Sequence, residues 1–363
     1  MTHLVLLGGG HSHVGVLHAL ASRTRPQSLH ITLINEAPAS PYSGMLPGVI
    51  AGQYAIEEMF IQLSPLAARA NVEFRQARVS QLDPQQRLLT LDNDEQPLAF
   101  DLLSINTGST PDLSAIPGAA QHATAVKPIA PMLQRLDAEL NDRAGNIVVV
   151  GGGAAGVEMA LALQTRLQGQ NRKITLLSSA DRLLPGLPAS AAQTALQELL
   201  ARGVQVRLNE RVTKLEQDRL DCSSGLHINS SLVIVATGAS APDWVRTSGL
   251  KLSDRGFILV TSTLQSSSHP WVFAAGDIAD IEHHPRPKSG VYAVRQAPIL
   301  AHNLLAASAG SSMQDYYPQE HGLVLINTAN GKAIASKNTW SAKGRWAWWL
   351  KDWIDTRFMK TYR

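Results

Sequence analysis

The stretch LVLLGGGHSHVGVL occupies residues 4–17. Four apolar residues run into three glycines, and the residues after the glycines continue as a helix. Gly8 permits a sharp turn and Gly10 lets the backbone approach a ligand closely, while the start of the helix offers free N–H groups and the positive end of its dipole. We therefore predict a strand, a turn and a helix start that together hold a pyrophosphate group.

A second glycine loop, GGGAAG at residues 151–156, follows an apolar strand at 147–150 and precedes an Ala-rich helix at 157–167. It carries the complete Gly-x-Gly-x-x-Gly pattern, in which Gly156 lets the helix pack closely on the strand. A glycine-rich turn without a ligand is the alternative. The first loop departs from this pattern, because His13 stands in place of its third glycine. His13 must therefore push the helix away from the strand or turn outward.

Three later strands end in short glycine motifs. Residues 102–105 lead into Thr107-Gly108-Ser109, residues 232–235 into Thr237-Gly238, and residues 271–275 into Gly276-Asp277. This repetition predicts an α/β fold with two Rossmann-like dinucleotide-binding domains, the second inserted in the first, followed by a hairpin and an amphipathic helix. The predicted limits are 1–112 and 245–310 for the first domain, 113–244 for the inserted domain and 311–363 for the C-terminal part.

The remaining elements are expected from local patterns. Further strands are predicted at 30–34, 72–79, 87–91, 174–177 and 204–208, and further helices at 14–21, 131–140 and 290–305. A hairpin is expected over 320–337, with Asn330-Gly331 as a two-residue turn. The loop APASPYSGMLPGVIAG at 37–52 is rich in Pro and Gly, which predicts a cover over a flat ligand.

The composition narrows the class of protein. The 363 residues are 44% apolar and 17% charged, as in a globular protein of two domains. The single cysteine excludes an intramolecular disulfide. No apolar run is long enough to span a membrane, and the short apolar N-terminal run is interpreted as a strand. The tail, residues 340–363, holds six Lys or Arg and two Asp or Glu, so it accounts for the net charge of +3. We therefore expect a cytoplasmic protein without a nucleic-acid partner.

The tail also has helical apolar spacing, and five of the seven tryptophans lie from residue 340 onward. The stripe consists of Trp346, Trp349, Leu350, Trp353, Ile354, Phe358 and Tyr362. One interpretation is an interfacial helix that contacts the inner face of a membrane. The alternative is a helix packed on its own domain or on the other copy of a homodimer. Asp352 and Asp355 weaken the attraction to anionic lipid.

In dinucleotide folds, an acid at the end of the second strand usually binds the ribose. In the inserted domain this place is held by Ser178, with Arg182 just beyond it. An acid would repel a 2′-phosphate, whereas Ser and Arg would not, so NADPH and NADH both stay open. In the first domain Asn35 holds the usual place and Glu36 follows it.

The segments TGSTPD at 107–112, TGASAPD at 237–243 and AAGD at 274–277 resemble those of the pyridine nucleotide-disulfide oxidoreductase flavoproteins, and within that class type II NADH dehydrogenases. A narrower resemblance is to the FAD/NAD(P)-binding module that some organisms fuse ahead of selenophosphate synthetase (selenide, water dikinase). It rests on GGGHSHVGVL, PYSGMLPGVIAG, VKP at 126–128, PKSGVYAVRQAP at 287–298 and WWLKDWIDTRF. The resemblance covers essentially the whole chain, and it implies bound FAD that is reduced by NADH or NADPH held in the inserted domain.

The loops and the resemblance together give the candidate ligand contacts. For FAD these are Gly8, Gly9, Gly10, His11, Ser12, His13, Glu36, Tyr42, Ser43, Met45, Thr107, Gly108, Lys127, Gly276 and Asp277. For the nicotinamide nucleotide they are Gly151, Gly153, Ala154, Ala155, Gly156, Glu158, Ser178, Arg182, Thr237 and Gly238. The Asp277 carboxylate suits a ribityl hydroxyl, with a helix N-cap as the alternative. Tyr42 and Met45 are expected to pack on the isoalloxazine, with plain loop core as the alternative.

The single cysteine limits the reaction mechanisms that are possible. Several members of the class need reactive thiols, whereas Cys222 lies in the polar stretch DCSSG, away in sequence from every flavin motif. Hydride should pass from nicotinamide to flavin, and electrons onward to a small-molecule acceptor, which we expect to be a quinone or another non-thiol compound. The resemblance does not settle which acceptor it is. Lys288, with the helix start at Gly290, is the candidate to stabilise negative charge on reduced flavin. Gln296 resembles the glutamine near the quinone in type II NADH dehydrogenases, or is a polar helix-surface residue.

Two other functions stay open: a reductase that serves selenium metabolism beside a separate selenophosphate synthetase, and a flavin redox sensor with low turnover. His11, His13, His283 and His284 raise the question of a metal. We expect none, because the flavin supplies the redox chemistry and no Cys or carboxylate stands at ligand spacing.

Overall fold

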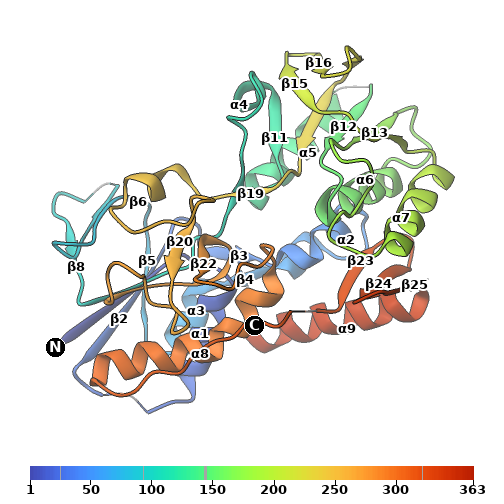
Figure 1. Cartoon of the computed structure of the whole chain (residues 1–363). Helices are drawn as coiled ribbons and strands as arrows, with labels where there is room; N and C mark the ends of the chain where they lie inside the picture. Colours follow the sequence, from blue (N-terminus) through green and yellow to red (C-terminus); the bar gives the residue numbers. More distant parts are fainter. Residues whose placement is uncertain (25, 93, 143–144, 321) are drawn as a thin grey trace.

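The computed structural model describes residues 1–363 except 25, 93, 143–144 and 321. The blue and orange parts of the chain form one domain, and the green and yellow parts form a second (Figure 1). The red C-terminal helix runs from the second domain toward the first.

The first domain is built on a five-stranded parallel sheet in the order β21–β9–β1–β2–β5. Its strands are β21 (Val272–Ala274), β9 (Leu102–Ile105), β1 (Thr2–Leu7), β2 (Leu29–Asn35) and β5 (Glu73–Gln76). Helices α1 (His11–Ala21) and α8 (Gly290–Ala309) pack against each other beside it. Gly15 permits this contact, since a Cβ at Gly15 would lie 2.5 Å from the Cβ of Ala297.

The second domain repeats this topology with a parallel sheet in the order β11–β18–β12–β13–β14. Its strands are β11 (Ala123–Ala125), β18 (Leu232–Val235), β12 (Ile147–Val150), β13 (Ile174–Leu177) and β14 (Gln205–Arg207). In each sheet the central strand leads into a glycine loop, and one neighbouring strand ends in Thr-Gly. The predicted repeat is therefore confirmed. β21 joins the first sheet only after the second is complete, which confirms the insertion, while the residue limits of the domains stay predictions.

The two crossings between the domains run together. β10 (Thr110–Pro111) and β19 (Ala239–Ser240), which follow the two Thr-Gly motifs, pair as antiparallel strands. The domains are thus joined by a two-stranded ribbon.

Smaller elements surround the two sheets. The antiparallel sheets contain β6 (Val79–Asp83), β7 (Leu88–Leu91) and β8 (Leu98–Ala99); β15 (Val212–Leu215), β16 (Arg219–Cys222) and β17 (His227–Asn229); and β3 (Ala39–Pro41) with β4 (Phe60–Gln62). β20 (Ile258–Val260) pairs in parallel with β22 (Ala279–Ile281). The other α-helices before the tail are α2 (Leu46–Ile50), α3 (Leu63–Arg69), α4 (Ala119–His122), α5 (Ile129–Asp142), α6 (Ala154–Arg166) and α7 (Ala189–Ala201). Single 3₁₀ turns cover η1 (Ser43–Met45), η2 (Ile56–Met59), η3 (Asp243–Thr247) and η4 (Gly276–Ile278).

The C-terminal part is a three-stranded antiparallel sheet and a helix. The sheet contains β23 (Val324–Asn327), β24 (Ala333–Lys337) and β25 (Trp340–Gly344), and α9 spans Arg345–Tyr362. Within the described residues, none of the helices combines the length and apolarity needed to cross a membrane.

Two local predictions were wrong. The strand predicted over 72–79 is two strands, β5 and β6, with residues 77 and 78 between them. The hairpin turn is longer than two residues, because the Thr328 N–H donates to the Lys332 carbonyl and encloses three residues. The predicted helical stripe from Trp346 to Tyr362 lies within α9, and residues 340–344 before it pair with β24 as β25.

Candidate functional site

The first glycine loop is tied to the ends of two neighbouring strands by Asn106. Its amide oxygen accepts the His13 N–H at 3.1 Å, and its amide nitrogen donates to the Ala275 carbonyl at 2.6 Å. Gly8 (φ +94°) and Gly10 lie so close that a Cβ on either would come within 2.6 Å of Asn106 oxygen atoms. The glycines are therefore required by backbone crowding at the strand ends.

His13 neither displaces the helix nor turns outward, as the sequence had suggested, but is fully buried in the loop. Its Nδ1 lies 2.6 Å from the Gly8 carbonyl oxygen, and its Nε2 lies 2.8 Å from the Ser104 hydroxyl. Burial lowers the pKa of His13 to about 4, so the ring is neutral at physiological pH. His13 is thus a structural part of the loop, behind the ligand-facing backbone.

A ring nitrogen of His11 is the clearest candidate in the site for a hydrogen bond to a ligand. Its Nε2 is buried and, among the described residues, has no hydrogen-bond partner. The ring contacts Tyr42 and Phe358 edge-on, with centroids 5.4 and 5.8 Å apart. Burial lowers the pKa of His11 to about 4, so Nε2 is available to one neutral hydrogen bond. An orphaned polar atom in an aromatic wall fits a bound flavin nucleotide, which supplies both polar atoms and a flat ring.

The Gly276-Asp277 turn faces two of the predicted contacts. The Asp277 carboxylate accepts from the Lys127 ammonium at 3.0 Å and from the Ser109 hydroxyl at 3.2 Å. A Cβ on Gly108 would meet open space, so the backbone there can approach a ligand. The structure therefore brings Thr107, Gly108 and the Gly276-Asp277 turn to the ends of two neighbouring strands of the first sheet, and Lys127, which follows β11 of the second sheet, reaches the same place.

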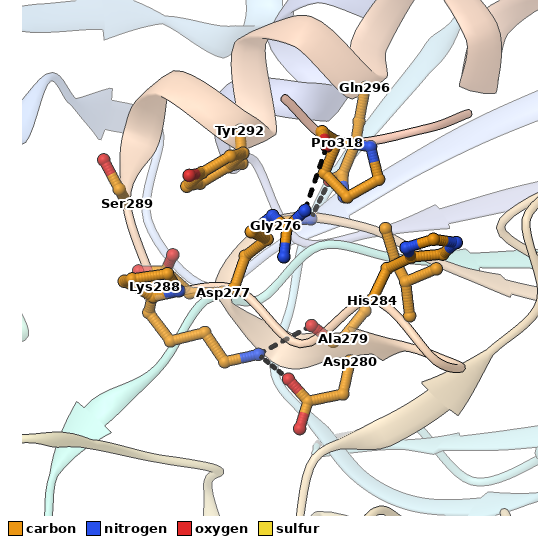
Figure 2. A pocket seen from close by; sticks show the side chains of 13 residues that line it. Gly276, Asp277, Ala279, Asp280, His284, Lys288, Ser289, Tyr292, Gln296 and Pro318 are labelled. Atoms are coloured by element: carbon orange, nitrogen blue, oxygen red, sulfur yellow. Dashed lines mark hydrogen bonds and ion pairs between the residues drawn. The ribbon is translucent and has the colours of Figure 1, made fainter. Parts of the chain in front are cut away.

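Lys288 and Gln296 lie near this turn, but their polar ends are already bonded (Figure 2). The Lys288 ammonium donates to the Ala279 carbonyl at 2.6 Å and to Asp280 at 2.7 Å, and lies 3.8 Å from the centre of the Phe257 ring. The buried Gln296 amide oxygen accepts the Gly276 N–H at 2.6 Å. Gln296 thus bonds the turn itself and Lys288 bonds β22, which follows it, and both line the pocket beside the turn, so their catalytic roles stay predictions.

The ribose positions of the two domains differ. In the first domain Asn35 accepts the Gly9 N–H at 2.7 Å, so it supports the loop, and the exposed Glu36 lies beyond it. In the second, Ser178 is buried at the end of β13, where its hydroxyl accepts the Ala180 N–H at 3.2 Å. Arg182 donates to the Pro185 and Leu187 carbonyls at 2.7 and 2.9 Å.

The second glycine loop follows its pattern. A Cβ on Gly156 would lie 1.8 Å from the Gly151 carbonyl oxygen, whereas one on Gly153 would meet open space. Gly156 therefore allows the helix contact, and Gly153 faces the ligand side together with Gly238, whose Cβ position is also open. Ala154 and Ala155 begin α6, one turn ahead of Glu158.

Glu158 projects from α6 toward the C-terminal part. It accepts the Asn327 N–H at 2.7 Å. Desolvation raises the pKa of Glu158 to about 7, although the charge of Lys351 acts in the opposite direction. A carboxyl group that titrates near neutrality beside a nucleotide loop can gain or lose a proton during turnover.

The tail helix α9 packs with its polar side inward. Ala347, Lys351, Asp355 and Met359 are buried, whereas Trp346, Trp349, Trp353 and Ile354 are 45%, 65%, 55% and 38% exposed. The sequence had placed Lys351 and Asp355 simply off the apolar stripe. They are inside because the Lys351 ammonium bonds Asp355 at 2.8 Å and the Gly44 carbonyl at 2.9 Å.

The same helix clamps the loop that carries Tyr42, Ser43 and Met45. The Tyr42 hydroxyl donates to Asp355 at 3.0 Å, and its ring stacks on Phe358 with centroids 4.5 Å apart. The Tyr54 hydroxyl donates to Asp352 at 2.7 Å. Met45 is buried. The tail thus holds the predicted flavin cover, and both tail acids are turned away from the exposed face.

Four residues support the site in ways that the sequence analysis did not predict. Asn106 and Lys351 had no predicted role, Asn35 supports the loop from the usual ribose position, and Asp355 holds Tyr42 and Lys351. An asparagine at the C-terminal end of a parallel strand was the available signal for the first two. Among the described residues, no group of three or more His, Cys, Asp or Glu side chains is placed to hold a metal.

Comparison with known proteins identifies the class. Residues 2–297 match the pyridine nucleotide-disulphide oxidoreductase family, and the chain belongs to that family. Members of the family bind FAD and NAD(P)H, so FAD and NADH or NADPH are the cofactors of this chain, while the domain that holds each of them stays a prediction.

Individual relatives agree with this assignment. Ferroptosis suppressor protein 1 of Xenopus laevis is 28% identical over 338 residues, covering 89% of this chain and 85% of that protein. Type II NADH:quinone oxidoreductase of Haemophilus influenzae is 27% identical over 223 residues, covering 56% of this chain and 50% of that protein. The structure of NDH2 from Plasmodium falciparum in complex with NADH has the same fold, with a TM-score of 0.80, 15% identity and coverage of 99% and 98% of the two chains.

Proposed function

We propose that this protein is an NAD(P)H oxidoreductase that passes electrons through FAD to a quinone-type or other non-thiol acceptor. The observation that carries the proposal is the place of its single cysteine. Cys222 is buried in β16 of the inserted domain, where desolvation and then Glu210 raise the pKa of its thiol to about 11. Such a thiol is a poor nucleophile, which favours direct transfer to an acceptor over disulfide chemistry.

The site residues support this chemistry by position. FAD, when bound, supplies two-electron transfer between a nicotinamide and an acceptor. Asp277, held by Lys127 at 3.0 Å, offers a fixed carboxylate for a hydroxyl of the nucleotide. His11 offers its free Nε2, and Tyr42 and Phe358 form an aromatic wall that excludes water. Gln296 bonds the Gly276-Asp277 turn, and Lys288 bonds β22, which follows the turn.

The test is anaerobic reduction of the FAD-loaded protein by NADH and NADPH, followed by addition of a short-chain quinone. We expect NADH or NADPH to bleach the flavin absorption, and the added quinone to restore it as fast as the enzyme turns over. Purified protein that does not retain FAD, or a reduced flavin that ignores quinone, would contradict the proposal.

The resemblance of GGGHSH and PYSGMLPG to the module fused with selenophosphate synthetase supports a second candidate, a reductase in selenium metabolism. The same reduced flavin, mixed with selenite or a selenium-carrying thiol in place of quinone, separates the two. Slow reduction by both nicotinamides with no acceptor turnover would instead favour a flavin redox sensor.

We further propose that the exposed face of α9 contacts a membrane surface, which makes the protein a peripheral protein on the cytoplasmic side of a membrane. The face displays Trp346, Trp349, Trp353 and Ile354, together with the exposed Arg345, Arg357 and Lys360. Both tail acids are bonded on the inner side, so they do not oppose anionic lipid. Exposed tryptophans beside basic residues are typical of interfacial helices.

This contact is tested by sedimentation with vesicles that contain anionic lipid. Replacing Trp346, Trp349 and Trp353 by Gln leaves the buried face of α9 unchanged and should abolish binding. Leu200→Gln on α7, a side chain 55% exposed on another surface, is the matched control and should bind as the wild type. If the triple variant binds as well as the wild type, the face has another role, and concentration-dependent sedimentation without vesicles would indicate a homodimer interface.

A further inference from the structure

We propose that the inserted domain takes NADPH in preference to NADH, with Arg207 binding the 2′-phosphate beside Ser178. The inference deepens the proposed function by naming its reductant. It rests on a ledge at the C-terminal edge of the second sheet, which we define as residues 178–182 and 207–210.

The ledge joins the ends of two adjacent strands. The Ser178 N–H donates to the Arg207 carbonyl at 2.9 Å, the Glu210 N–H donates to the Ser178 carbonyl at 2.9 Å, and the Asn209 N–H donates to the Ala180 carbonyl at 3.0 Å. Three main-chain bonds fix the two segments together. The main chain of Arg207 therefore lies directly beside Ser178.

The ledge also touches the nucleotide loop. A Cβ on Gly152 would lie 2.4 Å from the Ser178 hydroxyl oxygen. Ser178 thus occupies the place from which an acid binds the ribose hydroxyls in NAD-specific dinucleotide folds. Its short side chain accepts the Ala180 N–H and carries no charge, so nothing at this position repels a 2′-phosphate.

Arg207 is the group placed to bind that phosphate. Its backbone pairs with Leu177 on the neighbouring parallel strand, and strands in a sheet lie about 4.8 Å apart. Its side chain is exposed and, in the part of the chain that the structure describes, makes no hydrogen bond or ion pair. An arginine side chain is longer than this strand spacing, so the free guanidinium can extend to a ribose held at Ser178 and bind its phosphate through two parallel hydrogen bonds.

Arg182 adds fixed positive charge. Its guanidinium is held by the Pro185 and Leu187 carbonyls and has no carboxylate within ion-pair distance among the described residues. Of the nearby acids, Glu210 accepts the Ser224 hydroxyl at 2.8 and 2.9 Å, which turns it toward the β15–β17 sheet. Asp181 lies on the exposed side of the turn, and it is the group that would favour NADH if it bound the ribose instead.

Binding of two nucleotide fragments tests the inference without turnover. Calorimetry on the FAD-loaded full chain compares 2′,5′-ADP with 5′-AMP, which differ only in the 2′-phosphate. We expect 2′,5′-ADP to bind at least about tenfold more tightly, and Arg207→Ala to remove that difference while binding of 5′-AMP is unchanged. Lys173→Ala, an exposed cation at the opposite edge of the same sheet, is the control and should keep the difference. Equal binding of the two fragments by the wild type overturns the inference.

Rates of flavin reduction give a second readout. Ser178→Asp should lower kcat/KM for NADPH by more than about tenfold and leave that for NADH within a few-fold, because it restores the usual acid. Asp181→Asn should leave the preference for NADPH unchanged, and a switch toward NADPH on that change alone would show that Asp181 had selected NADH. If the protein prefers NADPH but does not reduce quinone, this inference holds and the proposed acceptor is contradicted. The failure of one can therefore be distinguished from the failure of the other.

Discussion

The Nδ1 atom of His13 lies 2.6 Å from the carbonyl oxygen of Gly8, at the place where the inserted domain has Gly156 against the carbonyl of Gly151. The two domains make the same turn-to-helix contact in different ways. One removes the side chain, and the other inserts an imidazole that bonds the carbonyl. Because a carbonyl can only accept, the His13 proton is on Nδ1, and Nε2 accepts the Ser104 hydroxyl proton.

Removing this imidazole should destabilise the first domain. His13→Ala leaves the buried Ser104 hydroxyl and the Gly8 carbonyl without partners and opens a cavity, at a cost of about 2–4 kcal/mol in the free energy of unfolding. Urea denaturation of the FAD-loaded protein measures it. His18→Ala, one turn and a half along the same helix on its exposed side, should change stability by less than about 0.5 kcal/mol. Similar values for the two variants would contradict the structural role of His13.

The same residue should make stability depend on pH. The pKa of His13 falls from 6.5 to about 4 on folding, so below pH 6.5 the unfolded chain binds a proton that the folded protein does not. The contribution of His13 to the free energy of unfolding is fully present above pH 6.5 and is lost as the pH falls toward 4. At pH 5 the loss is about 2 kcal/mol. Burial lowers the pKa of His11 in the same direction. We therefore compare the wild type with His13→Gln, because both proteins contain His11 and its contribution cancels. The difference in unfolding free energy between these two proteins should therefore shrink between pH 7 and pH 5.

These relationships show which parts of the molecule were predictable from the sequence. β1, β9, β21, β12 and β18 are short apolar runs that end in glycine motifs, and a local pattern of this kind identifies an element and its ligand-binding end. His13 could not be placed, because its partner Ser104 lies 91 residues away on another strand. The stripe on α9 was found, but Trp346, Trp349, Trp353 and Ile354 face outward, and only its C-terminal members Phe358 and Tyr362 pack inward. Lys351 and Asp355 can be buried only because Gly44 and Tyr42, more than 300 residues earlier, complete their hydrogen bonds.

Breaking the buried pair on α9 should release the flavin cover. Lys351→Met leaves the Asp355 carboxylate buried without its cation, which should cost about 3–5 kcal/mol and weaken FAD retention through Tyr42 and Gly44. Changing both partners, Lys351→Met with Asp355→Leu, removes the uncompensated charge and should recover much of that stability. Denaturation and FAD dissociation of the two single variants and the double variant form a mutant cycle. Additive effects in that cycle would mean that the pair is not coupled.

Lys288 and Lys127 should behave differently when each is changed to Met. Lys288 is buried against Asp280 and Phe257, so its loss should lower stability by about 3 kcal/mol with little change in the flavin spectrum. Lys127 is more exposed and holds Asp277 from the open side of the site. Its loss should shift the flavin absorption and weaken FAD binding while stability without FAD is unchanged. If Lys288→Met shifts the flavin absorption and Lys127→Met lowers the stability instead, the prediction is contradicted and Lys288 is the residue that contacts the flavin.

Glu158 should impose a pH dependence on the reaction with the nicotinamide. Desolvation raises the pKa of its carboxyl group from 4.5 to about 7, so it is protonated in about half of the molecules at neutral pH and ionised above that. Because it follows the Gly151–Gly156 loop by half a turn, its charge state should affect how the nicotinamide nucleotide binds. Stopped-flow reduction of the flavin between pH 5.5 and 8.5 should show an inflection near pH 7 in the wild type. Glu158→Gln, which keeps the acceptor for the Asn327 N–H but cannot ionise, should remove that inflection. An inflection that persists unchanged in Glu158→Gln would assign the titration to another group.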